Sequence, residues 1–129
     1  MSSRQDWRER VPLVLVIADA EQDRDFYAES FERRGWRAVA TRDGPRGVAQ
    51  AILLQPDVIM IDLDPRESDG CSFVQQLKAH ASTKAIPVIA CGPADDQVRR
   101  AATTAGVDAH VTKPCLPEYL VALARRHLN

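Results

Sequence analysis

The stretch Asp57-Val58-Ile59-Met60-Ile61-Asp62-Leu63 decides the fold more than any other part of this chain. It is a short apolar run with one aspartate before it and another near its end. Apolar runs of this length are typical of strands that a parallel sheet buries on both faces. A second run, from Pro12 to Ile17, is almost continuously apolar and precedes Ala18-Asp19. The two runs therefore predict two buried strands, each of which leads into an aspartate.

Short apolar runs alternate with helical patterns along the whole chain, and Gly35 and Gly106 are expected to end two of the helices. The predicted strands are 12–17, 36–40, 57–61, 86–91 and 109–112, and the predicted helices are 24–34, 45–54, 72–80, 95–105 and 116–128. This alternation implies a parallel sheet that is covered on both faces. Right-handed crossovers favour an α/β fold with a doubly wound five-stranded parallel sheet, strand order 2-1-3-4-5, and five helices, which is a flavodoxin-like architecture.

Length and composition limit the classes of protein to consider. The chain has 129 residues, of which 45% are hydrophobic, so it is long enough for one domain with a real core. We expect a flexible N-terminal tail over 1–10 and one folded domain over 11–129. The net charge of -1 argues against a dedicated nucleic-acid binder. No apolar stretch approaches the roughly 18 residues of a membrane span, and the polar N-terminus lacks a signal-peptide core, so a cytoplasmic protein is expected.

The three cysteines, Cys71, Cys91 and Cys115, contain no CxxC motif and give no disulfide framework, which fits a reducing cytoplasm. We expect them to be buried, inert thiols. A metal site that combines Cys91, Cys115 and His110 is an alternative, but no ligand-spacing motif favours it.

Open α/β sheets bind their ligands just beyond the carboxyl ends of the strands. In this chain the residues at those points are Asp19, Asp62, Gly92 and Lys113-Pro114. Two close carboxylates repel each other unless a cation intervenes, and Mg²⁺ is commonly held by one or two carboxylates with water and a phosphate. A lysine offers a point charge to a phosphoryl group, and a carboxylate can be the nucleophile that forms an aspartyl-phosphate. These residue types suggest phosphoryl transfer to an aspartate, although carboxylates and a lysine are also common as solvated surface charges.

The chain resembles the CheY-like receiver domains of bacterial response regulators over about residues 12–128. The pieces that carry the resemblance are the apolar strand before Ala18-Asp19, the stretch 57–63, Asp69-Gly70, Ile86-Pro87-Val88-Ile89, Ala105-Gly106-Val107-Asp108 and Thr112-Lys113-Pro114. No single piece is specific, but their order and spacing together identify the family.

The resemblance implies a role for each matching residue. Asp62 would accept a phosphoryl group from a histidine kinase or a phosphotransfer protein. Asp19, Asp62 and the backbone carbonyl of Asp64 would hold Mg²⁺. Lys113 would pair with the phosphoryl oxygens, and Pro114 would follow it, often through a cis peptide bond. Downstream proteins would read the face made by the fourth helix, fifth strand and fifth helix, where such domains often dimerise.

Three of the departures from the family pattern concern the predicted site. Ala18 stands where the family has the first acid of a pair, and a register shifted by one would make Ala20 the missing acid instead. Two unit charges 4 Å apart interact by about 4 kcal/mol at an effective dielectric constant of about 20, so Mg²⁺ binding is expected to be weakened. Gly92 replaces a Ser or Thr whose hydroxyl bonds the phosphoryl group. His110 replaces a Tyr or Phe, either as a pH-sensitive switch residue or as a partly exposed histidine at a strand end.

We therefore expect a stand-alone receiver in two-component signal transduction, which is a phosphoacceptor and not an enzyme beyond self-catalysed phosphotransfer and dephosphorylation. It would signal through protein contacts, with no DNA-binding domain and no membrane segment, and a homodimer is one option for its assembly. The alternative is a degenerate receiver that binds proteins without phosphorylation, which the missing acid and hydroxyl suggest. A flavodoxin-like binder or enzyme that uses the same sheet edge is the third hypothesis.

Overall fold

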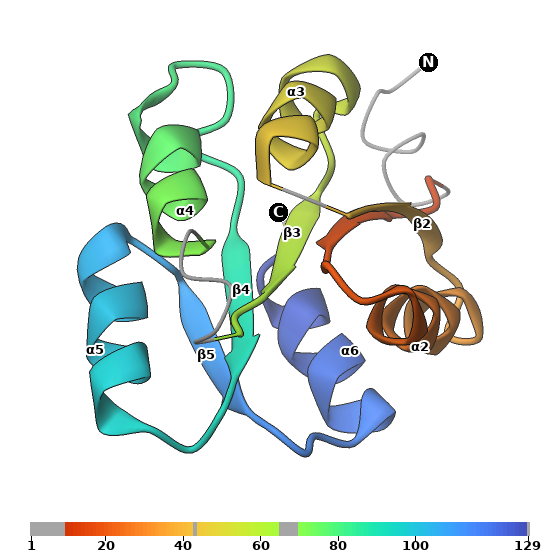
Figure 1. The fold of residues 1–129 in the computed structure, drawn as a ribbon. Coiled ribbons are helices and arrows are strands. Elements are labelled where there is room, and N and C mark those ends of the chain that lie inside the picture. Colours follow the sequence, from red (N-terminus) through yellow and green to blue (C-terminus); the bar gives the residue numbers. More distant parts are fainter. Residues whose placement is uncertain (1–9, 43, 65–69, 129) are drawn as a thin grey trace.

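The structure is a computed structural model that describes residues 10–42, 44–64 and 70–128, in which strands and helices alternate (Figure 1). The strands are β1 (Leu13–Ile17), β2 (Arg37–Thr41), β3 (Val58–Asp62), β4 (Val88–Gly92) and β5 (Ala109–Thr112). The helices are α2 (Glu21–Glu32), α3 (Gly44–Leu54), α4 (Gly70–Ala79), α5 (Asp96–Ala105) and α6 (Pro117–Arg126). The predicted tail over 1–10 lies almost entirely outside the described residues, as does Asp69 of the predicted Asp69-Gly70 motif.

All five strands are parallel and follow the order β2-β1-β3-β4-β5, which confirms the predicted doubly wound sheet. The pairing places Asp62 of β3 opposite Cys91 of β4 and Gly92 of β4 opposite Thr112 of β5. Because parallel strands all end at the same edge, this register brings the ends of β3, β4 and β5 together. The sheet edge that carries Asp62 is therefore the place to look for a site.

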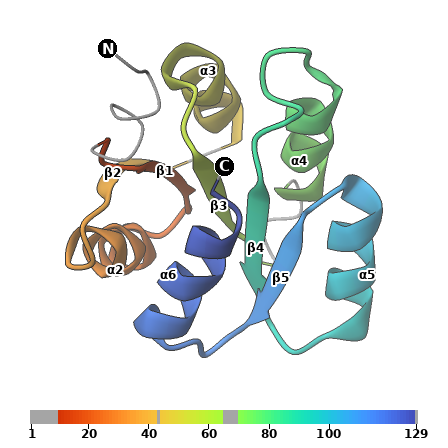
Figure 2. The same cartoon turned by 180° about the vertical axis from the view of Figure 1, so that it is seen from behind.

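Side chains from the two faces of the sheet form two separate cores. On one face, Val14 and Val16 pack in a cluster with buried residues of α2 and α6, among them Phe31 and Leu120. On the other face, Leu15 and Ile17 pack with buried residues of α3, α4 and α5. Alternate residues of a strand point to opposite faces, so the continuous apolar run of β1 serves both cores. The ribbon seen from the two sides shows this three-layered arrangement (Figures 1 and 2).

Helix α2 begins three residues earlier than the apolar periodicity predicts. The pattern predicts the first helix from residue 24, whereas α2 begins at Glu21 because its first turn is polar and carries no apolar signal. Acidic side chains in that turn, Glu21 and Asp23, complement the positive end of the helix dipole. The helix pattern also predicts Phe26 on the apolar face, but its side chain is 44% exposed while Tyr27 and Phe31 are buried.

Glycines end helices as predicted. Gly35 has φ of 90° shortly after α2, and Gly106 has φ of 112° as the C-cap of α5. Both angles lie in the left-handed region that glycine adopts without steric cost.

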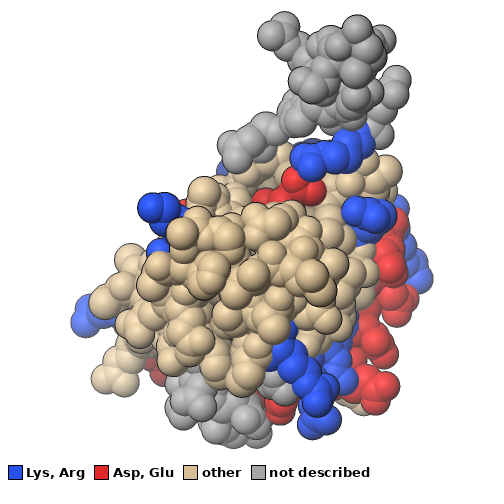
Figure 3. Space-filling model, turned by 90° about the horizontal axis from the view of Figure 1, so that it is seen from above, with Lys and Arg blue, Asp and Glu red and all other residues tan. Residues whose placement is uncertain are grey.

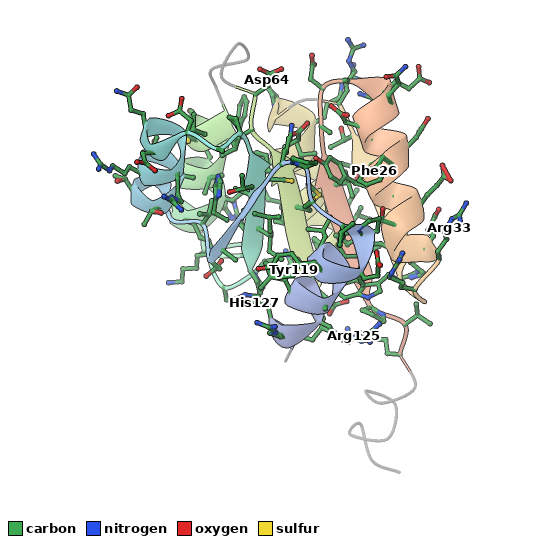
Figure 4. The ribbon with its side chains drawn as sticks, turned by 90° about the horizontal axis from the view of Figure 1, so that it is seen from below. Phe26, Arg33, Asp64, Tyr119, Arg125 and His127 are labelled. Carbon is green, nitrogen blue, oxygen red and sulfur yellow. The ribbon has the colours of Figure 1, made fainter. Side chains whose placement is uncertain are left out.

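Helix α6 contacts the segment that follows α2 through two arginines, since Arg34 pairs with Glu118 of α6 at 3.5 Å and Arg125 of α6 reaches back to that segment. The Arg125 guanidinium donates a hydrogen bond of 3.2 Å to the carbonyl oxygen of Arg34 and lies over the Trp36 ring, 5.9 Å from its centroid (Figure 4).

Positive and negative side chains are interspersed around the rim of the face that Figure 3 shows, and that face has no broad basic surface among the described residues. None of the helices that the structure describes has the length and apolar character needed to cross a bilayer.

Candidate functional site

The site is built around an ion pair between Asp62 and Lys113. Asp62 is the last residue of β3, and its side chain is only 5% exposed. Lys113 directly follows β5, its side chain is 34% exposed, and its Nζ contacts Asp62 Oδ1. The structure therefore brings together a buried carboxylate and a partly exposed ammonium group from two strands that are not neighbours in the sheet. The predicted proximity of the two side chains is thus found, and their roles stay a prediction.

Backbone hydrogen bonds hold the two partners in place. The Leu63 amide, next to Asp62, donates to the carbonyl of Cys91 at 2.8 Å. The Lys113 amide donates to the carbonyl of Gly92 at 2.8 Å, and the peptide bond from Lys113 to Pro114 is cis. The end of β4 thus anchors both the phosphoacceptor candidate and its lysine.

Burial and neighbouring charges perturb both members of the pair. Burial raises the pKa of the Asp62 carboxyl above its usual value, the hydrogen bond and charge of Lys113 lower it, and the Asp23 carboxyl raises it again. Burial alone would lower the pKa of Lys113, but the hydrogen bond and charge of Asp62 outweigh it, so that pKa is raised. A buried acid with a raised pKa beside a lysine, at the edge of an open sheet, is a typical functional-site signature.

Asp23 is the residue that the sequence reasoning missed. It lies in the first turn of α2, half-buried, with its carboxyl within hydrogen-bonding reach of Asp62. Asp23 and Lys113 also line the same open pocket of about 580 Å³, together with Phe26, Tyr27, Pro93, Ala94, Pro114 and Cys115. The signal that could have revealed it is its closeness in sequence to Asp19, because Asp19 lies just before α2 and Asp23 lies in its first turn.

The loop after β1 holds the residues expected at the acidic pair. Ala18 is buried at 1% exposure, and its amide donates to the carbonyl of Thr41 at 3.1 Å. Asp19 is exposed, and Arg24 Nη1 donates to the carbonyl oxygens of Ala18 and Asp19 at 3.0 and 2.7 Å. Arg24 therefore fixes the backbone of this loop. The role of Asp19 as a metal ligand stays a prediction.

Residues of the site fit a magnesium ion in part. Asp62 and Asp23 supply two close carboxylates, and Mg²⁺ commonly binds one or two carboxylates with waters and a phosphate. Within residues 10–42, 44–64 and 70–128, no three His, Cys, Asp or Glu side chains are grouped so as to hold a metal ion. Asp64 lies just beyond β3 and is half-buried (Figure 4), and the predicted use of its carbonyl as a ligand is untested.

Gly92 and His110 occupy the two predicted switch positions. Gly92 is the last residue of β4 and is buried, and a Cβ atom there would lie 3.3 Å from His110 Nε2. His110 is half-buried in β5, and its Nε2 has no hydrogen-bond partner among the described residues. Burial lowers the pKa of His110, and the positive charge of Arg99 lowers it further. The Nε2 edge of the imidazole therefore points inward, and the lowered pKa of His110 favours the neutral form of the ring.

Two of the three cysteines meet in the fold. Cys91 is fully buried, Cys115 is half-buried, and their Sγ atoms are 3.6 Å apart. Cys91 is buried as expected, whereas Cys71 and Cys115 are half-buried and Cys115 lines the open pocket.

Comparison with known proteins shows the family. The family described as the response regulator receiver domain matches residues 14–125. The DNA-binding dual master transcriptional regulator RpaA of Synechocystis sp. is 33% identical over 122 residues, which cover 92% of this chain and 50% of that protein. The phosphate regulon transcriptional regulatory protein PhoB of Escherichia coli is 33% identical over 112 residues, which cover 84% of this chain and 48% of that protein.

Solved structures show the same fold. The chemotaxis response regulator CheY4 of Vibrio cholerae superimposes with a TM-score of 0.82 at 22% identity, covering 92% of this chain and 100% of that one. The receiver domain of the sensor histidine kinase PA1611 from Pseudomonas aeruginosa, solved with a coordinated magnesium ion, gives 0.82 at 22% identity, covering 91% of this chain and 97% of that one. This chain spans about half the length of the curated relatives it matches. It belongs to the response regulator receiver domain family of two-component systems.

Proposed function

We propose that this receiver domain accepts a phosphoryl group on Asp62 and signals its phosphorylation state through contacts with other proteins. The observation that carries the proposal is the buried Asp62 carboxylate, paired with Lys113 at an open pocket. A histidine kinase or a phosphotransfer protein would be the donor, and a second protein would be the target. The chain covers about half of its curated relatives, so the expectation of a stand-alone receiver without a DNA-binding domain stays a prediction.

The proposed reaction uses the carboxylate as a nucleophile. One Asp62 oxygen attacks the phosphorus of a phosphohistidine, an O–P bond forms, and the N–P bond to the donor imidazole breaks. The donor nitrogen keeps the electron pair of the broken bond. The Lys113 ammonium pairs with the carboxylate before the reaction. It is placed to pair with the phosphoryl oxygens as negative charge moves onto them. Water later attacks the phosphorus of the acyl phosphate, the O–P bond to Asp62 breaks, and inorganic phosphate leaves, which returns the free carboxylate.

Magnesium would neutralise negative charge between the carboxylates and the phosphoryl oxygens. Asp62, Asp19 and the carbonyl of Asp64 would hold it, and we add Asp23 as the carboxylate that takes over from the acid missing at Ala18. The magnesium ion in the receiver domain of PA1611 supports a divalent ion in this fold. Because Ala18 supplies no charge, we expect binding to be weak before phosphorylation.

The proposed output surface is the face made by α5, β5 and α6, on which a homodimer or a target protein would form. Leu116, next to α6, is 66% exposed, and Tyr119, within α6 (Figure 4), is 52% exposed, so both offer apolar contact area. His110 of β5 would couple this face to the site, since it contacts the place where a phosphoryl-binding hydroxyl would stand at Gly92. Without that hydroxyl, we expect phosphorylation of Asp62 to be only weakly coupled to this face. The change in protein binding on phosphorylation would then be small.

A test combines acetyl phosphate and Mg²⁺ with intact-mass measurement. The wild-type chain is expected to gain one phosphoryl group, and the Asp62→Asn variant is expected to gain none. Asp25→Asn is a matched control, because Asp25 is exposed on the same helix as Asp23, and it should behave like the wild type. Equal inertness of wild type and Asp62→Asn, with both acetyl phosphate and a panel of phosphorylated histidine-containing donors, would favour a phosphorylation-independent binding module instead.

A further inference from the structure

A pair of thiols lies directly beside the candidate phosphoryl site. The Sγ atoms of Cys91 and Cys115 are 3.6 Å apart, although 24 residues separate them in sequence. A disulfide bond is about 2.05 Å long, so the two sulfur atoms would have to approach each other by about 1.5 Å to form one. Cys91 is the residue before Gly92, and Cys115 is the second residue after Lys113.

The two thiols differ in their access to solvent. Cys115 lines the open pocket of about 580 Å³ that Asp23 and Lys113 also line. Cys91 is 0% exposed and lies behind Cys115. A small reagent that enters the pocket therefore reaches Cys115 first, and Cys91 is placed to react only with Cys115.

Hydrogen bonds run from the interior toward the exposed sulfur. The Tyr27 hydroxyl donates to Cys91 Sγ at 3.4 Å, and the Cys91 thiol faces Cys115 Sγ. The hydrogen bond from Cys91 lowers the pKa of Cys115 to about 7 against the opposing effect of burial, and the charge of Lys113 lowers it further. The pKa of Cys91 is raised, by its hydrogen bond with Cys115 and by burial. A thiolate is the nucleophile in thiol oxidation, and an exposed sulfur beside a resolving thiol is the typical arrangement of a redox-sensing pair.

We propose that Cys115 and Cys91 form a reversible redox site, in which a hydroperoxide oxidises Cys115 and Cys91 then closes a disulfide. In the first step the Cys115 thiolate attacks one oxygen of hydrogen peroxide, the O–O bond breaks, and a sulfenic acid and hydroxide form. In the second step Cys91 sulfur attacks the sulfenic sulfur, the S–O bond breaks, and hydroxide leaves as water with the Cys91 proton. Two thiols and one peroxide thus give one disulfide and two waters.

This inference goes beyond the proposed function and does not rest on it, because the chemistry involves only the two sulfurs and the peroxide. The disulfide would link the end of β4 to the segment that follows Lys113. It would thus join two of the segments that frame the phosphoryl pocket.

The experiment treats the reduced full chain with hydrogen peroxide, alkylates the remaining thiols and maps the peptides by mass spectrometry. The expected result is a Cys91–Cys115 linked peptide lighter by two hydrogen atoms, with the number of alkylated thiols falling from three to one. The single remaining thiol should be Cys71, whose pKa burial raises, and dithiothreitol should restore all three.

Single variants separate the two steps. Cys91→Ser should accumulate a sulfenic acid on Cys115 that dimedone traps, Cys115→Ser should lose both products, and Cys71→Ser should match the wild type. Circular dichroism verifies that each variant is folded, and peptide mapping of the wild type stands even where a variant is not. Oxidation that falls on Cys71 first, or chains that crosslink to one another without a Cys91–Cys115 peptide, would overturn the proposal.

Discussion

Gly92 and His110 lie against each other at the ends of neighbouring strands, where a Cβ atom on Gly92 would be 3.3 Å from His110 Nε2. Gly92 does not have a positive φ, unlike Gly35 and Gly106, so its backbone conformation would accept a side chain. The imidazole therefore fills the space next to the site where the family pattern has a hydroxyl. Two of the residues that depart from the family pattern, Gly92 and His110, therefore contact each other.

Restoring the hydroxyl at Gly92 should strengthen phosphoryl binding. A hydrogen bond to a charged group contributes about 1.5–3 kcal/mol, so we predict that Gly92→Ser binds beryllofluoride with Mg²⁺ at least about tenfold more tightly than the wild type. The new Cβ atom is in tight contact with His110, so the ring must shift by a few tenths of an ångström. Titration followed by NMR measures the affinity. Gly92→Ala adds the same Cβ atom without the hydroxyl, and equal affinities of the Ser and Ala variants would contradict the prediction.

His110 should titrate below its ordinary pKa. Burial and then the charge of Arg99 lower its pKa from the usual 6.5, so the folded state favours the neutral ring. The contribution to stability is therefore complete above the unfolded-state pKa and is lost as the pH falls below it toward the folded-state pKa. The measurement is an NMR titration of the imidazole protons.

Two arginine variants test the cause of that shift. Arg99→Gln should move the His110 midpoint upward, whereas Arg100→Gln, at an exposed neighbouring position of α5, should leave it in place. A wild-type midpoint at or above 6.5 would refute the inward, neutral ring.

The ionised Asp62 carboxylate should lower the free energy of unfolding at neutral pH. Its folded-state pKa is raised, so the folded chain holds this proton more tightly than the unfolded chain, and stability falls as the pH rises through the folded-state pKa. We therefore predict that Asp62→Asn is more stable than the wild type at pH 7 without divalent ions. Each unit by which folding raises the pKa of Asp62 corresponds to about 1.4 kcal/mol of free energy of unfolding lost at neutral pH.

Urea unfolding across the pH range measures the difference. It should shrink as the pH falls toward the ordinary carboxyl pKa, where the wild-type side chain is neutral as well. Asp25→Asn, an exposed change on α2, should not reproduce the gain. An Asp62→Asn variant that is less stable than the wild type at pH 7 would show that the ion pair with Lys113 outweighs burial.

Asp23 should contribute to magnesium binding. Its carboxyl is within hydrogen-bonding reach of Asp62, and a carboxylate about 4 Å from another charge interacts by about 1 to 4 kcal/mol in dielectric constants of about 80 to 20. We predict that Asp23→Asn weakens Mg²⁺ binding by about tenfold in calorimetric titration. The exposed Asp25 offers the comparison, since Asp25→Asn should bind like the wild type. Unchanged affinity in Asp23→Asn would exclude it as a ligand and leave Asp19 as the second carboxylate.

The sequence predicts the sheet better than it predicts the site. Apolar runs such as Pro12 to Ile17 and right-handed connections determine the strand order, and the shared edge of parallel strands then places Lys113 near Asp62 without any further information. Residues on helices are harder to place. Asp23 sits in a polar first turn that apolar periodicity does not detect, so its approach to Asp62 depends on where α2 begins.

The sequence also does not determine the directions in which side chains point. Phe26 fits the apolar stripe of α2, yet the buried stripe follows Tyr27 and Phe31, and Phe26 faces the pocket rim. The meeting of Cys91 with Cys115 has no spacing motif, because it depends on how the chain turns after β5.

The most direct test of the central claim is a crystal structure of the chain with Mg²⁺ and beryllofluoride, a mimic of the phosphoryl group. We predict beryllium bonded to an Asp62 carboxylate oxygen, Lys113 Nζ on one of the fluorides, and Mg²⁺ on Asp62 with an oxygen of Asp23 or Asp19. A structure at saturating beryllofluoride in which Asp62 carries no beryllium and its carboxylate still forms the ion pair with Lys113 would contradict the account.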